Sequence, residues 1–551
     1  MTLASHHHPR PTPVTRLSDW RQGVTYQLYL RSFADGTGDG VGDLPGALQR
    51  LDYIQSLGVD SVWVSPWYVS PMADGGYDVA DFCNIDPLFG TLKDADLFID
   101  GCHRRGLRVI VDVVVNHCSS EHPWFRRALE SHPGSPEREM FYFRDGRGAS
   151  RDEPPTDWIS VFGGPAWTRI RERDGRWGQW YLHLFDSAQP DLNWHNPVIV
   201  NAFEDIFRFW FDRGVDGLRL DAVPAIGKDA DFRDAGCDPT VQFAPETDSP
   251  TPYWDSGHVH DIVAGWRQLA DSYSPPKYLV GEINVAHTDS LARYLRPGEL
   301  SSVFAMSLAK LPWSAEAFRS KVSHHLENAP SSGSWFTWVT SSHDEVRTVT
   351  RLGRMAGGDV NLEVGTERSR AILLMLGALP GGACLYQGDE LGLPQVTDIP
   401  RELLEDPIVA RTGDPSKGRD GCRVALPWSE SGVSLGFSSV APRVRQPRQW
   451  GEISVEAQEA RPASFLNFTR RVLDARRDFV EGPFQALTWL DWGEDVVAFT
   501  RGRLLCVVNF SEETLPCPDG YQVLLSSGSN EGHDIAPNCG AWLWATSDGE
   551  A

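Results

Sequence analysis

The chain of 551 residues contains no long apolar run. No segment approaches the roughly 18 consecutive apolar residues that a membrane helix needs. The start, from Met1 to Arg16, carries histidines and prolines but no apolar stretch of the kind found in a signal peptide. We therefore expect residues 1–18 to be a disordered leader and expect no contact with a membrane.

Positive charge is also scarce. Lys and Arg number 51 against 75 for Asp and Glu, which gives a formal net charge of -24. A partner such as a nucleic acid or an anionic membrane surface is bound by neutralising its phosphates with Lys and Arg. We therefore expect no nucleic-acid partner, and a neutral small molecule suits this balance better.

The nine cysteines are an odd number and are scattered without a paired spacing. In a large chain without a signal peptide this pattern indicates reduced thiols, and we expect a cytoplasmic location. The chain is rich in aromatic residues, with 21 Trp. This is the one compositional hint toward sugar rings, although most of these tryptophans are expected in the core.

Eight short apolar runs alternate with helical stretches over most of the chain. The run Arg108–Val115 is almost wholly apolar, as in strands that are buried on both faces of a parallel sheet. The expected strands are centred near residues 25, 62, 110, 217, 279, 302, 336 and 384. This order predicts an α/β fold, a closed TIM (β/α)8 barrel, with its chemistry at the carboxyl ends of the strands.

Two regions interrupt this alternation. Residues 118–188 are rich in Pro, Gly, charged and aromatic residues, and we expect a subdomain (subdomain B) inserted after strand three. The barrel then comprises residues 19–117 and 189–478. Residues 479–551 contain short strand-like runs split by turn residues, which predicts a C-terminal antiparallel β domain, a β-sandwich. The long connection 388–448 leaves the last barrel strand in a position to cover the site.

Residues 35–43 place acidic or hydroxyl oxygens at alternate positions, with glycines between them. Such a loop can turn several oxygens onto one hard cation, which predicts a calcium or magnesium site. The loop is shorter than an EF-hand loop and lacks its closing glutamate, so it is not read as one. A solvated Gly-Asp turn is the alternative.

Charged and imidazole side chains stand at the ends of four expected strands. Arg219 and Asp221 share a face because strand side chains alternate, and an arginine that close favours the ionised aspartate. An ordinary structural ion pair would explain this stretch alone. The other strand ends contribute Asp112, His117, Glu282, His343 and Asp344. Like charges raise one another's pKa, so such a set on one rim indicates a functional site.

A pair of carboxyl groups on opposite sides of a glycosidic bond is the minimum for a retaining glycosidase. Asp221, beside its arginine, suits attack on the anomeric carbon. Glu282, in an apolar run, suits the group that protonates the leaving oxygen and later takes a proton from water. Asp344 would hold ring hydroxyls and favour the cationic transition state, with His117 and His343 donating hydrogen bonds to the same sugar.

These motifs stand in the order and spacing of the α-amylase superfamily, glycoside hydrolase family thirteen. The chain resembles in particular its α-glucosidase and oligo-1,6-glucosidase branch, over nearly the whole length after the leader. The matching stretches are Asp112–His117, Gly217–Asp221, Gly281-Glu282 and His343-Asp344, with supporting stretches at Gly76–Val79, Ile85–Gly90, Gln189–Asn193, Gln387–Glu390 and Gly418–Arg423.

The resemblance implies Asp221 as nucleophile, Glu282 as acid/base and Asp344 as transition-state stabiliser. The residues that it implies for the pocket of the terminal glucose are Tyr77, Asp78, His117, Phe185, Arg219, His343 and Arg423. The ligands that it implies for one structural Ca²⁺ or Mg²⁺ are Asp35, Thr37, Asp39, Asp43 and the backbone carbonyl of Val41. No organic cofactor is expected.

The expected function is the exo-acting hydrolysis of small α-glucosides, such as maltose, short maltooligosaccharides or sucrose, through a covalent glucosyl-Asp intermediate. A transglucosidase, or a sucrose or trehalose isomerase, would use the same intermediate with a different acceptor. A non-catalytic heavy chain of an amino-acid transporter would need a membrane anchor and would tolerate lost carboxylates, and neither applies.

The residue after the expected nucleophile, Ala222, matches neither the Thr common in maltose-preferring relatives nor the Val common in isomaltose-preferring ones, so the preferred linkage stays open. A monomer or homodimer is expected.

Overall fold

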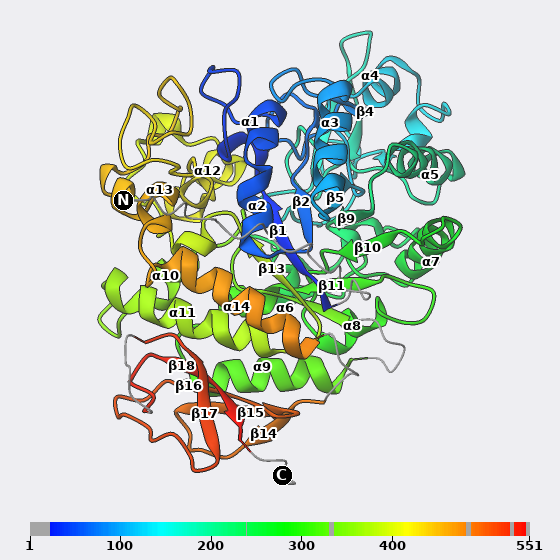
Figure 1. Ribbon diagram of the computed structural model, residues 1–551. Coiled ribbons are helices and arrows are strands. Elements are labelled where there is room, and N and C mark those ends of the chain that lie inside the picture. The colour runs from blue at the N-terminus through cyan, green and yellow to red at the C-terminus, as the bar shows by residue number, and fades with distance from the viewer. Residues whose placement is uncertain (1–21, 239, 330–334, 481–485, 529–533, 547–551) are drawn as a thin grey trace.

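The computed structural model describes residues 22–238, 240–329, 335–480, 486–528 and 534–546 (Figure 1). The expected disordered leader, residues 1–18, lies outside these residues. Figure 1 shows a central barrel surrounded by helices, with a smaller sheet that contacts two of those helices below it.

Eight parallel strands close into a barrel in the order β1-β13-β12-β11-β10-β9-β5-β2. Their bounds are β1 Val24–Leu28, β2 Ser61–Val64, β5 Arg108–Val114, β9 Gly217–Asp221, β10 Tyr278–Gly281, β11 Ser302–Ala305, β12 Trp335–Val339 and β13 Gly382–Tyr386. Each strand contains one of the eight expected positions, which confirms the predicted TIM barrel. Nearly all of their residues are buried, because helices cover the outside and side chains fill the interior.

Helices lie around the barrel (Figure 1). Their bounds are α1 Leu44–Gln49, α2 Leu51–Leu57, α3 Leu92–Arg104, α5 Pro197–Asp212, α6 Pro245–Asp248, α7 His258–Asp271, α8 Thr288–Arg293, α9 Ala315–Glu327, α10 Thr348–Leu352, α11 Leu362–Ala378, α13 Val455–Glu459 and α14 Phe465–Val480. Helix α5 illustrates why these segments form helices. Asn196 accepts a hydrogen bond from the Val198 amide, Pro197 begins the helix, and an apolar stripe that includes Phe203 and Trp210 is buried.

The insertion between β5 and α5 has its own small sheet. Helix α4 (Pro123–Glu130) precedes three antiparallel strands, β6 (Phe143–Arg144), β7 (Trp167–Arg171) and β8 (Trp177–Leu182). A further pair, β3 (Tyr68–Val69) and β4 (Asp81–Ile85), lies in the connection after β2. Both insertions leave carboxyl ends of barrel strands, so they can supply side chains to one rim.

The C-terminal region forms one five-stranded antiparallel sheet. Its strands are β14 Thr488–Leu490, β15 Val496–Arg501, β16 Leu504–Asn509, β17 Tyr521–Ser526 and β18 Gly540–Ala545. A β-sandwich would need a second, facing sheet, which the described residues of this region do not contain. Barrel helix α11 takes its place. Trp542 Nε1 donates to the Leu374 carbonyl at 3.0 Å, and a Cβ on Gly377 would lie 2.9 Å from the Trp542 ring.

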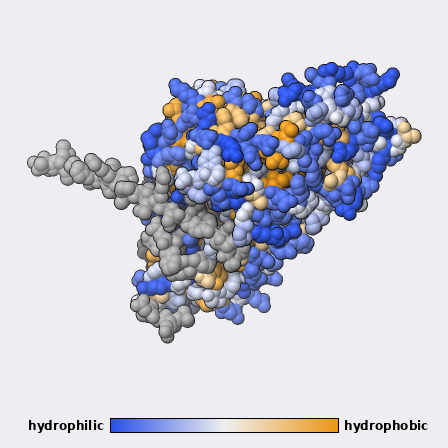
Figure 2. Space-filling view, turned by 90° about the vertical axis from the view of Figure 1, so that its right-hand side faces the viewer, coloured by the Kyte–Doolittle hydropathy of each residue, from blue (hydrophilic) through white to orange (hydrophobic). Residues whose placement is uncertain are grey.

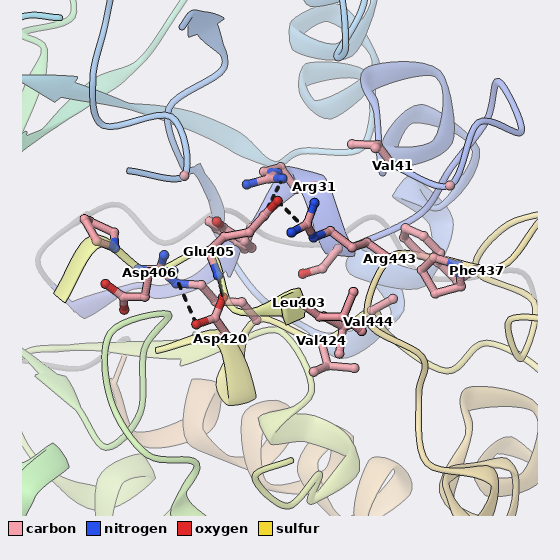
Figure 3. A pocket seen from close by; sticks show the side chains of 18 residues that line it. Arg31, Val41, Leu403, Glu405, Asp406, Asp420, Val424, Phe437, Arg443 and Val444 are labelled. Carbon is pink, nitrogen blue, oxygen red and sulfur yellow. Dashed lines mark hydrogen bonds and ion pairs between the residues drawn. The ribbon is translucent and has the colours of Figure 1, made fainter. Parts of the chain in front are cut away.

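The connection 388–448, which we call the lid, contains α12 (Pro407–Thr412) and several 3-10 turns. Figure 3 shows how the lid is fastened to the barrel. Glu405 accepts from Arg31 Nη2 at 3.1 Å, and its other oxygen lies 3.1 Å from Arg443 Nε. Arg31 belongs to the 3-10 turn Leu30–Ser32 after β1, so its contact with Glu405 joins the lid to the barrel rim, whereas the contact between Glu405 and Arg443 lies within the lid.

All nine cysteines are free thiols, in agreement with their scattered spacing. Among the described residues, no helix combines the length and the apolar character that crossing a membrane requires. Hydrophilic residues cover most of the described surface on the face in Figure 2.

Candidate active site

Three carboxylates from three neighbouring strands meet at one guanidinium. Arg219, on β9, donates from Nη1 to Asp112 Oδ1 at 2.8 Å and to Asp221 Oδ1. Its Nη2 donates to Glu282 Oε2 at 2.5 Å. All four side chains are buried or nearly so. The two expected catalytic carboxyl groups, far apart in the sequence, are therefore held by the two ends of one planar group.

The backbone directly after Asp221 has an uncommon conformation. Ala222 has φ +44°, in the left-handed region that residues with a side chain rarely adopt. A 3-10 turn, Val223–Ile226, follows at once. The Ala222 amide donates to Glu282 Oε2 at 3.2 Å, and the Val223 amide donates to the Glu282 carbonyl at 3.2 Å. The turn after one carboxylate thus positions the other.

The shared guanidinium does not neutralise all three carboxylates. Burial raises the pKa of Asp221 well above its usual range, and Glu282 and Asp112 add to this effect against the opposing charge of Arg219. Burial likewise raises the pKa of Asp112 to about 6. The expectation that Arg219 alone keeps Asp221 ionised is thus incomplete, because one positive charge is divided among three acids. Asp112 and Asp221 both accept from Arg219 Nη1, and groups this close titrate together.

Asp344, which follows β12, has the opposite surroundings. Its Oδ1 accepts from Arg419 Nη1 at 3.1 Å and from Arg423 Nη2 at 2.8 Å. Burial alone would raise the pKa of Asp344, but the guanidinium groups of Arg419 and Arg423 hold it well below its usual range. Asp344 is therefore a permanent negative charge in the site.

The two imidazoles at the rim are buried and neutral. Burial lowers the pKa of His343 and of His117 to about 3. The His343 ring stacks on Tyr77 with the centroids 5.3 Å apart, and the Tyr77 hydroxyl donates to Asp112 Oδ2 at 3.0 Å. His117 packs on Phe185 at 4.9 Å. These rings can act as hydrogen-bonding groups without carrying a charge.

A cavity of about 300 Å³ opens beside these groups. Its size is typical of a site for a small molecule. Six of the ten predicted catalytic and pocket residues line it, namely Tyr77, His117, Phe185, Asp221, Glu282 and Asp344. The other four, Asp78, Arg219, His343 and Arg423, are outside this lining. Each of those four makes a hydrogen bond to a lining residue or to its neighbour in the chain.

The resemblance implied that Asp78 lines the pocket of the terminal glucose, but in the structure Asp74 lines the cavity and Asp78 does not. The Asp78 carboxylate accepts hydrogen bonds from Ser70 Oγ and from the amides of Ala73 and Asp74, so it shapes its own loop. Burial raises the pKa of Asp78 to about 6. Asp74 instead lines the cavity, and its Oδ1 accepts from Arg419 Nη2 at 2.7 Å.

Sequence reasoning missed several lining residues. Arg419 stands inside the Gly418–Arg423 motif, but only Arg423 was assigned a role. In the structure Arg419 binds Asp74, Asp344 and the buried Asp406 of the lid. Asn284 donates to Glu282 Oε1 at 2.9 Å, and its position two residues after Glu282 was the only signal. Further lining residues that no motif marks are Phe162, Gln242, Phe243, Glu246, Trp254, Lys310 and Lys417.

The loop 35–43 is held by its own hydrogen bonds. Asp35 accepts from the amides of Thr37, Gly38 and Gly40, at 3.0, 2.6 and 2.7 Å. Asp43 Oδ2 accepts from the Thr37 hydroxyl at 2.8 Å. Among the residues that the structure describes, no three or more His, Cys, Asp or Glu are grouped so that they could hold a metal ion. The predicted set also includes the Thr37 side chain and the Val41 carbonyl, so the Ca²⁺ or Mg²⁺ stays a prediction.

Comparisons with known proteins agree with this geometry. Residues 27–481 match the family described as "Alpha amylase, catalytic domain". The chain is 33% identical over 512 residues to an α-glucosidase of Apis mellifera, covering 89% of this chain and 85% of that protein. It is 34% identical over 547 residues to a trehalose-6-phosphate hydrolase of Escherichia coli, with coverage of 91% and 92%. An oligo-1,6-glucosidase of Parageobacillus thermoglucosidasius is 31% identical over 539 residues, with coverage of 90% and 91%.

Similar proteins of solved structure include an α-glucosyl transfer enzyme and an isomaltulose synthase. An α-glucosyl transfer enzyme is 34% identical with a TM-score of 0.84, and the match covers 96% of this chain and 99% of that one. An isomaltulose synthase from Erwinia rhapontici NX5 is 28% identical with a TM-score of 0.83, and the match covers 95% and 98%. With its matching barrel and the carboxylates at its rim, the chain belongs to the α-amylase family of glycoside hydrolases.

Proposed function

We propose that the protein is a retaining, exo-acting α-glucosidase that hydrolyses small α-glucosides through a glucosyl ester on Asp221. The observation that carries this proposal is the shared contact of Asp221 and Glu282 with Arg219 on the wall of one cavity. In retaining glycosidases the two carboxyl groups lie only about 5 Å apart, and two acids on one guanidinium suit that distance.

In the first step an Asp221 oxygen attacks the anomeric carbon of the terminal glucose. The glycosidic C–O bond breaks, and the leaving oxygen takes the proton of Glu282. In the second step Glu282 removes a proton from water, whose oxygen attacks the same carbon and releases Asp221. The amide of Asn284, which donates to Glu282 Oε1, orients this carboxyl group toward the bond that is cleaved.

Asp344 supplies the permanent negative charge that an oxocarbenium-like transition state needs. Arg419 and Arg423 keep it ionised and fix its direction. The neutral His117 lines the cavity with its ring packed on Phe185, and it does not oppose the positive charge of the transition state. His343 lies outside the cavity lining, and its Nε2 is 2.6 Å from the Tyr77 hydroxyl, so it orients Tyr77, which lines the cavity.

An ion pair at one part of the cavity wall supports attack at a chain end. The buried Asp74 and the half-buried Arg419 form an ion pair between the lid and the loop that follows β3. An α-glucan chain could not pass through this end of the cavity, so only a terminal glucose would reach Asp221. Short substrates suit a cavity of about 300 Å³.

Transfer of the glucosyl group to a sugar is the second candidate, and the similarity to an α-glucosyl transfer enzyme and an isomaltulose synthase supports it. Both activities share the intermediate and differ in whether water or a sugar reaches it. A time course with maltose, isomaltose, sucrose, trehalose and kojibiose tests the choice. Free glucose as the main early product supports hydrolysis, whereas new oligosaccharides or isomers in its place would overturn it.

A further inference from the structure

A lysine stands between two glutamates at the solvent side of the cavity. Lys310 Nζ lies 2.6 Å from Glu246 Oε1 and 3.5 Å from Glu345 Oε1. Lys310 ends the 3-10 turn after β11, Glu246 belongs to α6 after β9, and Glu345 directly follows Asp344. Three separate strand-to-helix connections therefore bring one cation and two anions together.

The cluster lies on the side where the leaving group would sit. Lys310 and Glu246 line the same cavity as Asp221 and Glu282. Their side chains are 44% and 39% exposed, whereas the side chain of Asp74, which lines the same cavity, is 5% exposed. If the terminal glucose occupies the buried end, the second sugar of the substrate extends past Glu282 toward Lys310.

The balance of charge at this end disfavours an anionic ligand. A single lysine would attract a phosphate, but here Glu246 lies 2.6 Å from its ammonium group, and Glu345, at 3.5 Å, adds a second negative charge once the pH exceeds its raised pKa of about 7. A phosphate at Lys310 would lie close to both of them, and like charges at that distance repel. The neighbouring Lys417 has Nζ 3.3 Å from the side-chain oxygen of Gln242, and it is exposed to solvent.

We propose that Glu246 and Glu345 determine specificity by neutralising Lys310, so that the site accepts a neutral leaving sugar and rejects a phosphorylated one. This inference rests on the proposed function and names its substrate class. It would separate this chain from the trehalose-6-phosphate hydrolases to which it is similar. Hydrolysis of such a phosphorylated disaccharide needs only water and yields glucose and glucose 6-phosphate.

The test compares glucose with glucose 6-phosphate as inhibitors of p-nitrophenyl α-glucoside hydrolysis, so it does not depend on the unknown linkage. The variants are Glu246→Gln, Glu345→Gln, the double variant, and the double variant that also carries Lys310→Met. Glu363→Gln is the matched control, because it removes one negative charge from an exposed position at the start of α11. Release of glucose 6-phosphate from trehalose 6-phosphate is measured in parallel.

We expect wild type to bind glucose 6-phosphate more weakly than glucose. In the double variant the inhibition constant for glucose 6-phosphate should fall at least about tenfold, with that for glucose changed less than about threefold. Lys310→Met should reverse the gain, and Glu363→Gln should behave as wild type. If the double variant is unstable, each single variant should show a smaller change in the same direction.

Two results would overturn this inference. One is a wild type that binds glucose 6-phosphate more tightly than glucose, or cleaves trehalose 6-phosphate faster than trehalose. The other is an unchanged ratio of inhibition constants in folded variants that still cleave the aryl glucoside. Loss of the proposed function would look different, because aryl glucoside cleavage would then survive in Asp221→Asn.

Discussion

Arg419 Nη2 donates to Asp74 Oδ1 at 2.7 Å, and this one bond joins the lid to the loop that follows β3 at the buried end of the cavity. Asp74 also accepts from Gln189 Nε2 at 3.1 Å, close to where subdomain B returns to the barrel. Three segments that are distant in the sequence therefore close one end of the site, and Asp74 is their common partner.

Asp74→Asn should weaken substrate binding more than the chemical step. The amide keeps the shape of the carboxylate but loses its charge, so we expect KM for the preferred disaccharide to rise about tenfold, with kcat reduced less than about threefold. Asp52→Asn is the control, because Asp52 pairs with Arg105 at the surface and its side chain is 82% exposed. An unchanged KM in Asp74→Asn would show that this pair does not form the end of the pocket.

Glu282→Gln should affect substrates according to their leaving groups. Maltose needs a proton on its leaving oxygen and should lose at least about a thousandfold in kcat/KM. An aryl glucoside with an acidic leaving group needs little protonation, so its glucosylation step should lose far less. Equal losses on both substrates would reject the acid role of Glu282. Azide added to Glu282→Ala should speed turnover and give a glucosyl azide of retained configuration.

The titration of Glu345 should make the stability of the protein depend on pH. Burial raises the pKa of Glu345 to about 7. The negative charge of Asp344 adds to this rise, and the positive charge of Lys310 opposes it. An unfolded Glu titrates near about 4.3, so between these pH values the folded protein keeps a proton that the unfolded chain has lost. The contribution of this group to stability is therefore full at low pH and is lost as the pH rises toward 7.

Glu345→Gln removes that titration. We expect Tm of the variant, relative to wild type, to rise by about 2 °C between about pH 4.5 and pH 7.5. Thermal unfolding at a series of pH values measures this difference, with Glu363→Gln as the control. A difference that stays constant across the series would contradict the raised pKa of Glu345.

The predicted cation in the loop 35–43 can be tested by chelation. If Ca²⁺ or Mg²⁺ is bound there, its removal should lower Tm more than it lowers the initial rate, because the cation would stabilise only the folded state. Asp39→Asn should remove this response. The hydrogen bonds to Asp35 and Asp43 could instead hold the loop alone, in which case Tm would be the same with and without the chelator.

Much of the fold could be predicted because buried parallel strands have a plain signature. The run Arg108–Val114 is mostly apolar, as expected of a strand buried on both faces. In the strand Gly217–Asp221, the alternation of side chains places Arg219 and Asp221 on one face. Closing eight such strands into a barrel then brings their ends together without knowledge of any contact. For this reason the carboxylates at one rim could be predicted, and the C-terminal strands were also placed.

Other features could not be predicted, because they depend on contacts between side chains that the sequence does not determine. Asp74 and Asp78 lie in one loop, and the amides of that loop decide which carboxylate turns away from the cavity. The C-terminal strands pack on α11, so no second sheet is needed among the described residues. Lys310 and Glu246 come from connections without a motif, and only the fold brings them together.

The central claim is that Asp221 forms a covalent bond to glucose, and trapping that ester tests it most directly. The protein is treated with 5-fluoro-α-glucosyl fluoride, whose ester hydrolyses slowly, and the labelled peptide is identified by mass spectrometry. We predict one sugar per chain, attached to Asp221, and no label on Asp221→Asn. A label on another residue, or turnover of a natural α-glucoside with inversion of the anomeric configuration, would contradict the account.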